Sequence, residues 1–307
     1  MAHPHRVMRL PRPAGTIADV NAVAVIGRET NETTVDLVRR WRAFGTDARL
    51  LSPQQARASL RRGDVALARL DVLPTLDGVE EGLLDLLVLQ ARGVRLINNA
   101  RAIVNAHDKL RTARCLAAAG VPHVETTHVR HGDPLDFRPP VVVKPRFGSW
   151  GRDVFRCDDE QAIRDVFTTI AQRRWFMRHG AIVQPLMPPM GRDLRLLVAH
   201  GAVVGAEARI AAPGEWRTNI SLGGSHLPLS PGSDPIDIAV AAAASIGGDF
   251  VGIDLMPAFG GFVVLEINAA VEFDVSYATD GDVFARAAIA LGFMPEPLEA
   301  PALVQLA

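Results

Sequence analysis

The sequence predicts an α/β protein with α+β character, in which a small parallel α/β layer precedes a strand-rich region. Strands and helices alternate along residues 21–100, and such alternation is typical of a parallel sheet with crossover helices. Two apolar, β-branched stretches, residues 251–256 and 262–273, flank the turn signal Pro257–Gly261, so they predict an antiparallel hairpin. A content of 48% hydrophobic and 22% charged residues is ordinary for a folded globular chain.

Composition also disfavours several classes of protein. The 307 residues suffice for one large or two to three smaller domains. A formal net charge of −1 disfavours a dedicated nucleic-acid binder, which normally carries a strong basic excess. Cys115 and Cys157 are too few for a disulfide framework or a zinc site, and they favour a reducing, cytoplasmic compartment. No apolar run approaches the roughly 20 residues that span a bilayer, so no membrane partner is expected.

The N-terminal region is predicted to consist of a flexible lead-in, residues 1–20, followed by a small α/β domain over residues 21–100. The lead-in contains Pro and Arg but no apolar segment of signal-peptide length. No GxGxxG fingerprint occurs, so a dinucleotide site is not supported. The apolar spacing predicts strands at 21–27, 47–51, 64–70 and 94–97, and helices at 32–44, 53–60 and 82–91.

Arg69 ends the third of these strands. Ligands of open α/β sheets bind at the carboxyl ends of the strands, so Arg69 is a candidate substrate contact. A solvated arginine at a strand end explains the residue equally well.

A lysine and a glycine-containing loop suggest an anion site in the middle of the chain. After a connection at 98–105, Asp108 caps a helix over 108–120 that places Lys109 in the first turn, where a cation opposes the helix dipole. A strand at 121–129 and another at 141–144 follow, and the second ends in Lys144. The loop after it contains Gly148, Ser149, Trp150 and Gly151, and lacks the GK[ST] of a P-loop. Its glycines permit close backbone approach to a phosphate, although a hairpin turn and a solvated lysine remain alternatives.

Three arginines stand in apolar surroundings in the second half of the chain. A helix over 160–177 and a strand over 182–185 come first, and the strand breaks into a proline-rich joint that could read an adenine edge. Arg195 and Arg209 lie on two strands within 193–210, joined at His200–Gly201. Arg217 and Asn219 share a face if residues 215–224 are extended. Each arginine alone would be read as a salt bridge, but three together favour a phosphate or carboxylate pocket. Helices over 236–247 and 280–291 complete the chain.

The hairpin at 251–273 carries oxygen-bearing side chains on otherwise apolar strands. Glu266 and Asn268 are two residues apart, so they project from the same face. If the hairpin turns about Gly260, Asp254 lies opposite Glu266 on that face. Two carboxylates and an amide oxygen suit a hard cation such as Mg²⁺. The alternative is a surface hairpin whose polar groups are hydrated.

The order of these motifs resembles an ATP-grasp enzyme. Within that superfamily the chain looks like the RimK-type amino-acid ligases, and it is most similar to the LysX-type enzymes, which join an amino acid to the C-terminal glutamate of an acidic carrier protein. The resemblance covers about residues 60 to 295, and the ordered set is specific although no single motif is. Its carriers are Lys109-Leu110, Lys144 with its glycine loop, Gln184-Pro185, Gly191-x-Asp193-x-Arg195, GSWGR, WRTN and EINAAVEF.

The resemblance implies an ATP-grasp fold behind an N-terminal pre-ATP-grasp domain. The central lobe with the glycine loop would occupy residues 101–185, and the C-terminal lobe with the metal and substrate site would occupy residues 186–307. Implied ligands are ATP and Mg²⁺, with Mn²⁺ as a substitute and two ions in the site.

The resemblance also implies a role for each candidate residue. Lys109 and Lys144 would bind ATP phosphates, under a closing loop formed by Gly148, Ser149, Trp150 and Gly151. The joint Gln184, Pro185, Leu186 and Met187 would hold adenine, and Asp193 would hold the ribose. Asp254, Glu266 and Asn268 would bind the metal. The γ-phosphate and acyl phosphate would meet Arg195, Arg209, Arg217 and Asn219, and the substrate would meet Arg69, Arg209 and Asn219.

The activity implied is carboxylate activation followed by amide formation. A carboxylate takes the γ-phosphoryl group of ATP, and an amine then displaces phosphate from the acyl phosphate. The expected partners are an amino acid and a Glu-terminated peptide or small acidic carrier protein, and a homo-oligomer is expected. Alternatives are a kinase on the same fold and a nucleotide-binding module without catalysis, although a module has no use for a complete metal site. The segment around Arg69 departs from the LysX-type pattern because Asp71 replaces a neutral residue, which leaves the amino acid and its acceptor open.

Overall fold

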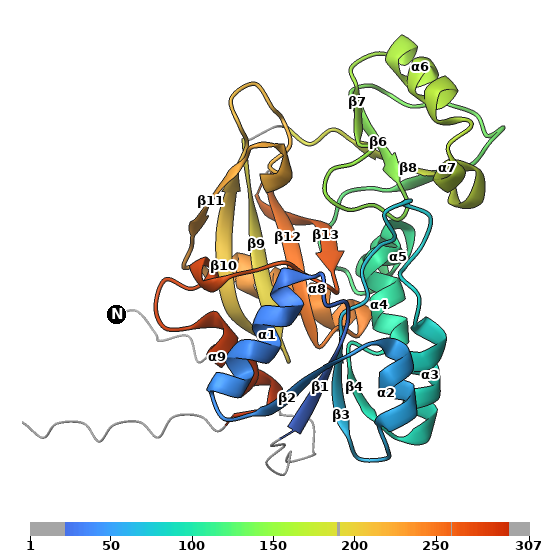
Figure 1. The fold of residues 1–307 in the computed structure, drawn as a ribbon. Coiled ribbons are helices and arrows are strands. Elements are labelled where there is room, and N and C mark those ends of the chain that lie inside the picture. The colour runs from blue at the N-terminus through green and yellow to red at the C-terminus, as the bar shows by residue number, and fades with distance from the viewer. Residues whose placement is uncertain (1–21, 189–190, 259, 295–307) are drawn as a thin grey trace, which may run out of the picture.

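The computed structural model describes residues 22–188, 191–258 and 260–294, which form one parallel and two antiparallel sheets with helices against them (Figure 1). The predicted mixed α/β class is therefore confirmed. The predicted domain limits at residues 100 and 185 stay a prediction.

The N-terminal sheet is parallel throughout, in the strand order β2-β1-β3-β4. Side-chain caps explain where its first two helices begin. Asn31 accepts a hydrogen bond from Thr34 N at the start of the first helix, and Ser52 and Gln55 form a capping box at the second. The elements are β1 (Ala22–Ile26), α1 (Glu32–Ala43), β2 (Asp47–Leu51), α2 (Pro53–Ser59), β3 (Val65–Ala68), α3 (Leu83–Arg92) and β4 (Arg95–Ile97).

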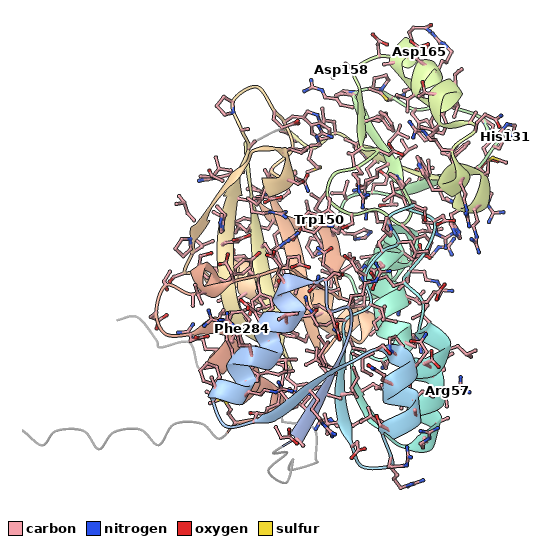
Figure 2. All side chains as sticks on the ribbon, viewed as in Figure 1. Arg57, His131, Trp150, Asp158, Asp165 and Phe284 are labelled. Carbon is pink, nitrogen blue, oxygen red and sulfur yellow. The ribbon has the colours of Figure 1, made fainter. Side chains whose placement is uncertain are left out.

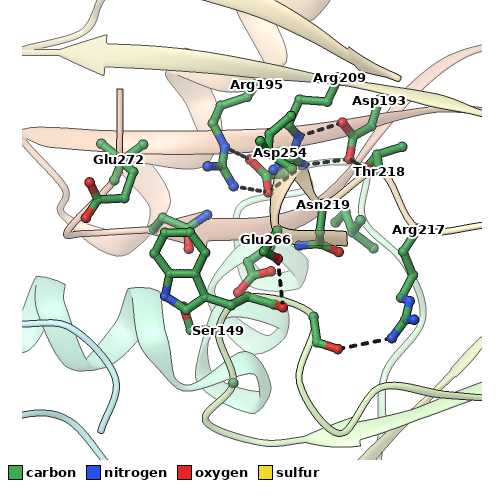
Figure 3. A pocket seen from close by; sticks show the side chains of 18 of the residues that line it. Ser149, Asp193, Arg195, Arg209, Arg217, Thr218, Asn219, Asp254, Glu266 and Glu272 are labelled. Carbon is green, nitrogen blue, oxygen red and sulfur yellow. Dashed lines mark hydrogen bonds and ion pairs between the residues drawn. The ribbon is translucent and has the colours of Figure 1, made fainter. Parts of the chain in front are cut away.

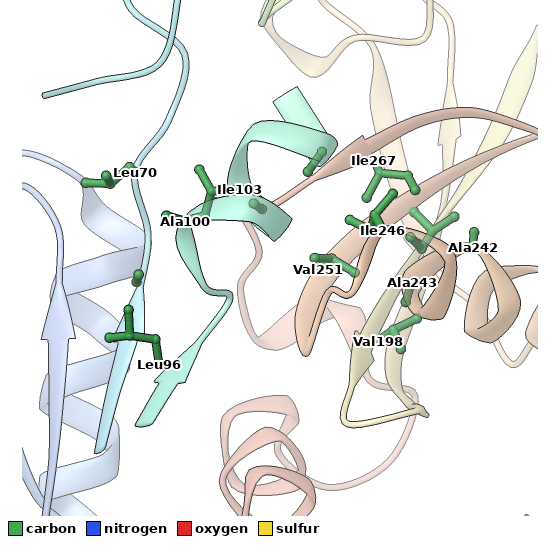
Figure 4. Packing of buried hydrophobic residues seen from close by; sticks show 14 of the residues in the cluster. Leu70, Leu96, Ala100, Ile103, Val198, Ala242, Ala243, Ile246, Val251 and Ile267 are labelled. Carbon is green, nitrogen blue, oxygen red and sulfur yellow. The ribbon is translucent and has the colours of Figure 1, made fainter. Parts of the chain in front are cut away.

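The prediction of an irregular connection at 98–105 is wrong, because most of this segment belongs to the helix α4 (Ala100–His107). Asn99 caps it by accepting from Ala102 N, and Asp108 ends it and caps the next helix, α5 (Lys109–Ala118), as predicted. Ile103 of α4 is buried in one core with residues of the N-terminal sheet, of α8 (Ser233–Ile246) and of the five-stranded sheet (Figure 4). Packing on both sides, rather than local propensity, makes this short helix stable.

A small lobe is built on a four-stranded antiparallel sheet in the order β5-β8-β6-β7, with its own core (Figure 1). The predicted single helix at 160–177 is wrong: the chain leaves the helix at residues 171–173 and starts a second one, which turns Trp175 and Phe176 into the core. The predicted strand at 121–129 is shorter than expected. The elements are β5 (Thr127–Val129), β6 (Val141–Pro145), β7 (Phe155–Cys157), α6 (Glu160–Ile170), α7 (Arg174–His179) and β8 (Ala181–Pro185).

The largest sheet has five antiparallel strands in the order β11-β10-β9-β12-β13. The predicted hairpin is confirmed as β12–β13, although its second strand ends at Asn268 rather than at residue 273. The predicted turn at His200–Gly201 between β9 and β10 is also confirmed. The remaining elements are β9 (Arg192–Ala199), β10 (Ala202–Ile210), η1 (Ile220–Leu222), β11 (Ser225–Pro228), β12 (Phe250–Ala258), β13 (Gly261–Asn268), η2 (Val275–Tyr277) and α9 (Val283–Leu291).

Strand alternation gives this sheet two different faces. On β9, Leu194 and Leu196 belong to the core that includes α8, whereas Leu197 and Ala199 join a second core with α9. Asp193 and Arg195 share the second face but precede the apolar positions. The α9 face is therefore apolar at one end and charged at the other, and the charged end is left open for a ligand.

Across the described residues, every helix is too short or too polar to span a bilayer.

Candidate functional site

A cavity of about 550 Å³ opens over the charged end of the five-stranded sheet, and the small lobe contributes its other wall. Trp150 of the glycine loop lies between the two parts (Figure 2). Eighteen of the nineteen predicted site residues line this cavity: Lys109, Lys144, Gly148, Ser149, Trp150, Gly151, Gln184, Pro185, Leu186, Met187, Asp193, Arg195, Arg209, Arg217, Asn219, Asp254, Glu266 and Asn268. Segments separated by up to about half the chain are thus brought to one place.

The strand register arranges charged side chains in a row across the sheet. Glu207 pairs with Arg195, Arg195 with Asp254, and Asp254 with Glu266. The sequence-based expectation that Asp254 lies opposite Glu266 is confirmed. Paired residues of antiparallel strands share a face, so four charged groups from β10, β9, β12 and β13 line up on the cavity floor.

Two arginines on this face of the sheet form bidentate ion pairs with Asp254 and Asp193 (Figure 3). Arg195 donates from Nε and Nη2 to the two carboxylate oxygens of Asp254, at 2.7 and 2.8 Å. Arg209 donates to both oxygens of Asp193, at 2.8 and 2.6 Å, and also to Asp254 Oδ2 at 2.9 Å. Thr218 Oγ1 completes the shell of Asp193 at 2.6 Å. Asp193, the predicted ribose ligand, therefore lies in an ion pair beside the cavity.

These ion pairs decide the protonation of buried groups. Burial raises the pKa of Asp254, but the charges of Arg195 and Arg209 outweigh it and bring this pKa to about 2. Burial lowers the pKa of Arg195, and the ion pair with Asp254 reverses the effect and raises it well above its usual value. Asp254 and Arg195 are thus both charged at neutral pH although they are largely buried.

Lys109 links the floor to the glycine loop. Its Nζ donates to Glu266 Oε1 at 2.7 Å and to the carbonyl oxygen of Gly148 at 2.9 Å. The backbone of Lys109 also donates to Arg146 O, and Arg146 makes a bidentate pair with the cap residue Asp108. The start of α5 is therefore fixed against the base of the loop.

Lys144, at the end of β6, differs from the other cations of the cavity. It is 7% exposed, and no hydrogen bond or ion pair joins its Nζ to another residue in the described part of the chain. Burial, followed by repulsion from Lys109, lowers the pKa of Lys144 to about 8. A buried ammonium without a partner is costly, so this position favours an anion brought by a ligand.

The glycine loop contacts the segment on the opposite wall. Arg217 Nη1 donates to Gly151 O at 3.2 Å, and Ser221 Oγ donates to Trp150 O at 3.3 Å. Gly151 has φ +66°, and a Cβ there would lie 2.9 Å from Asn219 Oδ1, so a larger residue would be strained and crowded. Residues 215–224 form a loop that contains the short turn η1, so the extended conformation that would place Arg217 and Asn219 on one face is not found. Within this loop Arg217 pairs with Glu215.

The donor set of the hairpin fits a hard cation. Asp254, Glu266 and Asn268 line the cavity from adjacent strands, and their side chains supply oxygens only if Asn268 turns Oδ1 toward the ion. Asn268 Nδ2 is buried and has no hydrogen-bond partner within residues 22–188, 191–258 and 260–294. Rotation of this amide by 180° exchanges the positions of Oδ1 and Nδ2, so Asn268 can turn its oxygen toward a bound cation.

Arg69 does not line the cavity, which corrects its assignment as a substrate contact. It is 3% exposed, and it donates to Thr34 Oγ1 at 3.0 Å and to Val271 O at 2.9 Å. Burial lowers the pKa of Arg69, with Glu272 acting in the opposite direction. Arg69 therefore fastens the N-terminal sheet to the segment after β13, behind the cavity wall.

Several cavity residues were not anticipated, among them Glu207, His226, Glu272 and Tyr277. Glu207 could have been predicted from the sequence, since it stands two residues before Arg209 on the same strand and so shares its face. His226 was not, because the short strand β11 has no strong local signal.

Comparison with known proteins identifies the family. Residues 106–289, more than half of the chain, match the RimK-like ATP-grasp domain. The chain belongs to the RimK-like ATP-grasp family. The resemblance to RimK-type amino-acid ligases is thereby confirmed.

Named relatives of this RimK-like protein are ligases. The glutamate–LysW ligase ArgX of Sulfurisphaera tokodaii is 33% identical over 204 residues, which cover 61% of this chain and 68% of that protein. The tetrahydromethanopterin:α-L-glutamate ligase of Methanosarcina acetivorans is 31% identical over 225 residues, covering 64% and 66%. The chain spans about half to two thirds of the length of the curated relatives it matches. The expected class, an ATP-grasp ligase that forms amide bonds, is confirmed.

Solved structures confirm the ATP-grasp fold. D-cycloserine synthetase DcsG has a TM-score of 0.66 at 23% identity, and the match covers 88% of this chain and 98% of that one. The RimK domain ATP-grasp protein of Sphaerobacter thermophilus has a TM-score of 0.62 at 20% identity, covering 88% and 99%.

Proposed function

We propose that this RimK-like protein is an ATP- and Mg²⁺-dependent carboxylate–amine ligase that works through an acyl phosphate and releases ADP and phosphate. The acceptor is the C-terminal glutamate of a peptide or small acidic carrier protein, and the amine is an amino acid. One observation carries the proposal: a floor of carboxylates and guanidinium groups, to which the buried Lys109 is bonded, shares one cavity with the buried Lys144. The volume of about 550 Å³ lies in the range of small-molecule sites.

In this proposal the lysines and the loop hold the nucleotide. Lys144 gains a partner when phosphate oxygens reach it, and Lys109 already lies between the floor and the loop. Gly148 and Gly151 allow the backbone to approach the phosphates, and Trp150, 48% exposed, can cover them and exclude water. The joint from Gln184 to Met187 would hold the adenine.

Asp254, Glu266 and Asn268 would hold Mg²⁺, or Mn²⁺ in its place, with room for two ions. A bound ion of this kind neutralises charge on the phosphates and positions them for in-line transfer. The carboxylates of this set accept hydrogen bonds from Arg195, Arg209 and Lys109, which orient them before any ligand arrives.

Arg195, Arg209 and Arg217 would stabilise the charge that develops on the transferred phosphoryl group. The substrate carboxylate attacks the γ-phosphorus, ADP leaves, and an acyl phosphate forms. The amine then attacks the carbonyl carbon, and phosphate leaves as the amide bond closes. Because the guanidinium groups are fixed by bidentate pairs, they need little reorganisation when charge shifts.

The choice of substrate rests on relatives. Their names include glutamate–LysW ligase and α-L-glutamate ligases, which supports an amino acid as one substrate and a carrier protein or peptide as the other. Asp71 lines the cavity, in the segment where the sequence departs from the LysX-type pattern, so the amino acid need not be that of those enzymes.

A screen of ADP release across the twenty amino acids tests the proposal. Each reaction contains ATP, MgCl₂ and one amino acid, with and without a synthetic acidic peptide that ends in Glu. We expect ADP and phosphate release that requires both peptide and amine, with a mass gain on the peptide equal to one amino-acid residue. A stable phosphorylated product without amide would identify a kinase instead, and no release with any pair would contradict the proposal.

A further inference from the structure

A glutamate, a histidine and a tyrosine form a cluster at the β11 edge of the cavity. His226 Nδ1 lies 2.7 Å from Glu207 Oε2, and Tyr277 OH donates to Glu207 Oε1 at 2.7 Å. All three residues line the cavity. Glu207 is 2% exposed, whereas the His226 side chain is 34% exposed. The glutamate is thus enclosed by its two partners, and the imidazole faces the open space.

The strand register brings this cluster next to the arginine floor. His226 on β11 pairs with Arg209 on β10, and Arg209 pairs with Asp193 on β9. Neighbouring strands lie about 5 Å apart, so His226 stands one strand from the guanidinium that contacts Asp254. Because paired residues of antiparallel strands share a face, the imidazole and the Arg209 guanidinium lie on the same side of the sheet, toward the cavity.

Hydrogen bonding fixes the tautomer of His226. An ionised carboxylate only accepts hydrogen bonds, so the proton of a neutral imidazole must be on Nδ1, where it is donated to Glu207. The lone pair is then on Nε2, which has no hydrogen-bond partner among the residues that the structure describes. Glu207, held by Tyr277, also stabilises the imidazolium that forms when Nε2 takes a proton. A carboxylate behind a histidine is the arrangement of a general base.

We propose that His226 is the general base that deprotonates the amine substrate, and that Glu207 is the residue that positions it. The proposal rests on the ligase function proposed above and adds a residue to its second step. An amino acid arrives as an ammonium ion, which has no lone pair for attack. His226 Nε2 takes one proton, the C–N bond forms, and the C–O bond to phosphate breaks. The leaving phosphate takes the second proton as HPO₄²⁻, and one hydrogen stays on the amide nitrogen.

The surroundings of His226 favour a cation. Glu207 lies beside the ring on β10, Ser276 Oγ of η2 lies 3.4 Å from Nδ1, and Tyr277 completes the cluster. Arg209 and Arg195 are the cationic neighbours, and their charges are neutralised by ion pairs with Asp193 and Asp254. Asp274 and Glu272 line the same cavity on the segment that follows β13. An ammonium group would be attracted to this end of the cavity.

The test separates the two half-reactions. Hydroxylamine is mostly uncharged at neutral pH, so it traps the acyl phosphate as a hydroxamate without needing a base. The peptide ending in Glu is assayed with ATP and Mg²⁺, once with hydroxylamine and once with the amino acid that reacts fastest in the screen. His226→Gln is compared with wild type and with His131→Gln, a variant at an exposed position on the outer edge of the small lobe (Figure 2).

We expect His226→Gln to form hydroxamate within about twofold of wild type, while amide formation falls by about 10²-fold or more. Its amide rate should rise with pH as the free amine becomes more abundant, which a merely structural change would not produce. Glu207→Gln should reduce amide formation less and shift its pH profile, with hydroxamate formation retained. His131→Gln should match wild type in both assays.

Two other results have distinct meanings. If His226→Gln forms amide as fast as wild type, or loses hydroxamate and amide equally, the base assignment is wrong while the ligase function stands. If wild type forms no peptide-dependent hydroxamate, the proposed function itself is contradicted.

Discussion

Two buried cations face each other across the cavity, and they are held in opposite ways. Arg209, on the five-stranded sheet, is 5% exposed and donates to two carboxylates. Lys144, on the small lobe, is 7% exposed and has no partner among the described residues. Asp193 and Asp254 keep the pKa of Arg209 above its usual value, against burial and Arg195, whereas burial and Lys109 bring the pKa of Lys144 down to about 8.

The contrast separates two tasks. The guanidinium groups of Arg195 and Arg209 are already paired with carboxylates of the sheet face. These groups therefore stay oriented whether or not a ligand is bound. The small lobe carries a charge that burial disfavours, and a phosphate would relieve that cost. We infer that the sheet supplies fixed geometry for the chemistry and that the small lobe supplies the affinity for the nucleotide.

Glu266→Gln should have the largest effect, because Glu266 joins the two sides through Lys109 and belongs to the donor set. The change removes a charge with little change of volume. We expect turnover to fall by about 10³-fold or more while the fold is retained. Steady-state ADP release and a thermal unfolding scan would check this, and activity close to wild type would refute the metal assignment.

Arg209→Met tests whether the sheet face depends on its own ion pairs. It leaves the buried Asp193 without its ion-pair partner and removes one of the two arginines that contact Asp254, which should lower the free energy of unfolding by about 3–5 kcal/mol. The control is Arg39→Met, which breaks the exposed Arg39–Asp36 pair and should change stability by less than about 1 kcal/mol. Urea denaturation measures both, and equal effects would mean that the buried network is not special.

Lys144→Met keeps the apolar stem and removes the charge. Loss of a charged hydrogen bond of about 1.5–3 kcal/mol corresponds to ATP binding weakened by roughly 10- to 100-fold. Stability without nucleotide should be unchanged or higher near pH 7, because the disfavoured charge is gone. Isothermal titration calorimetry would measure the Kd for ATP. An unaltered Kd would show that Lys144 does not bind ATP and that the glycine loop is only a turn.

The smallest expected effect is a proton taken up with ATP. A pKa of about 8 means that Lys144 is about half protonated at pH 8 without ligand, and a bound phosphate should restore the full charge. Binding should therefore take up about half a proton at pH 8 and much less at pH 6.5, as measured by calorimetry in buffers of different ionisation enthalpy. Lys144→Met should abolish this uptake.

The lowered pKa of Lys144 also determines how the stability of the folded protein changes with pH. The pKa of Lys144 in the folded protein lies below the value of 10.5 expected in the unfolded chain, so the unfolded chain binds more protons between about pH 8 and 10.5. The unfavourable contribution of Lys144 is thus full below pH 8 and is relieved as pH rises through this window.

Sequence was sufficient where function follows from local periodicity. Asp193 with Arg195, and Glu266 with Asn268, are two residues apart on one strand, so their common face could be predicted, and the turn near Gly260 fixed the partner of Asp254. The glycine loop could be predicted for a similar reason, because its glycines and Lys144 lie close together in the sequence.

Sequence was insufficient where distant segments decide. Arg69 is buried because the chain around Val271, some 200 residues later, passes over it and accepts its hydrogen bond. Helix α4 follows Asn98, whose side chain bonds to Asp249 and Phe250, so its position depends on β12. The ion-pair partners of Arg195 and Arg209, and the Glu207–His226 contact, likewise require the strand order of the sheet.

A crystal structure with Mg²⁺ and a non-hydrolysable ATP analogue tests the central claim most directly. We predict oxygens of Asp254, Glu266 and Asn268 at about 2.0–2.1 Å from bound ions, and Lys144 Nζ within hydrogen-bonding distance of a phosphate oxygen. Metal and triphosphate bound away from these side chains, with the floor and Lys144 unchanged, would contradict the account.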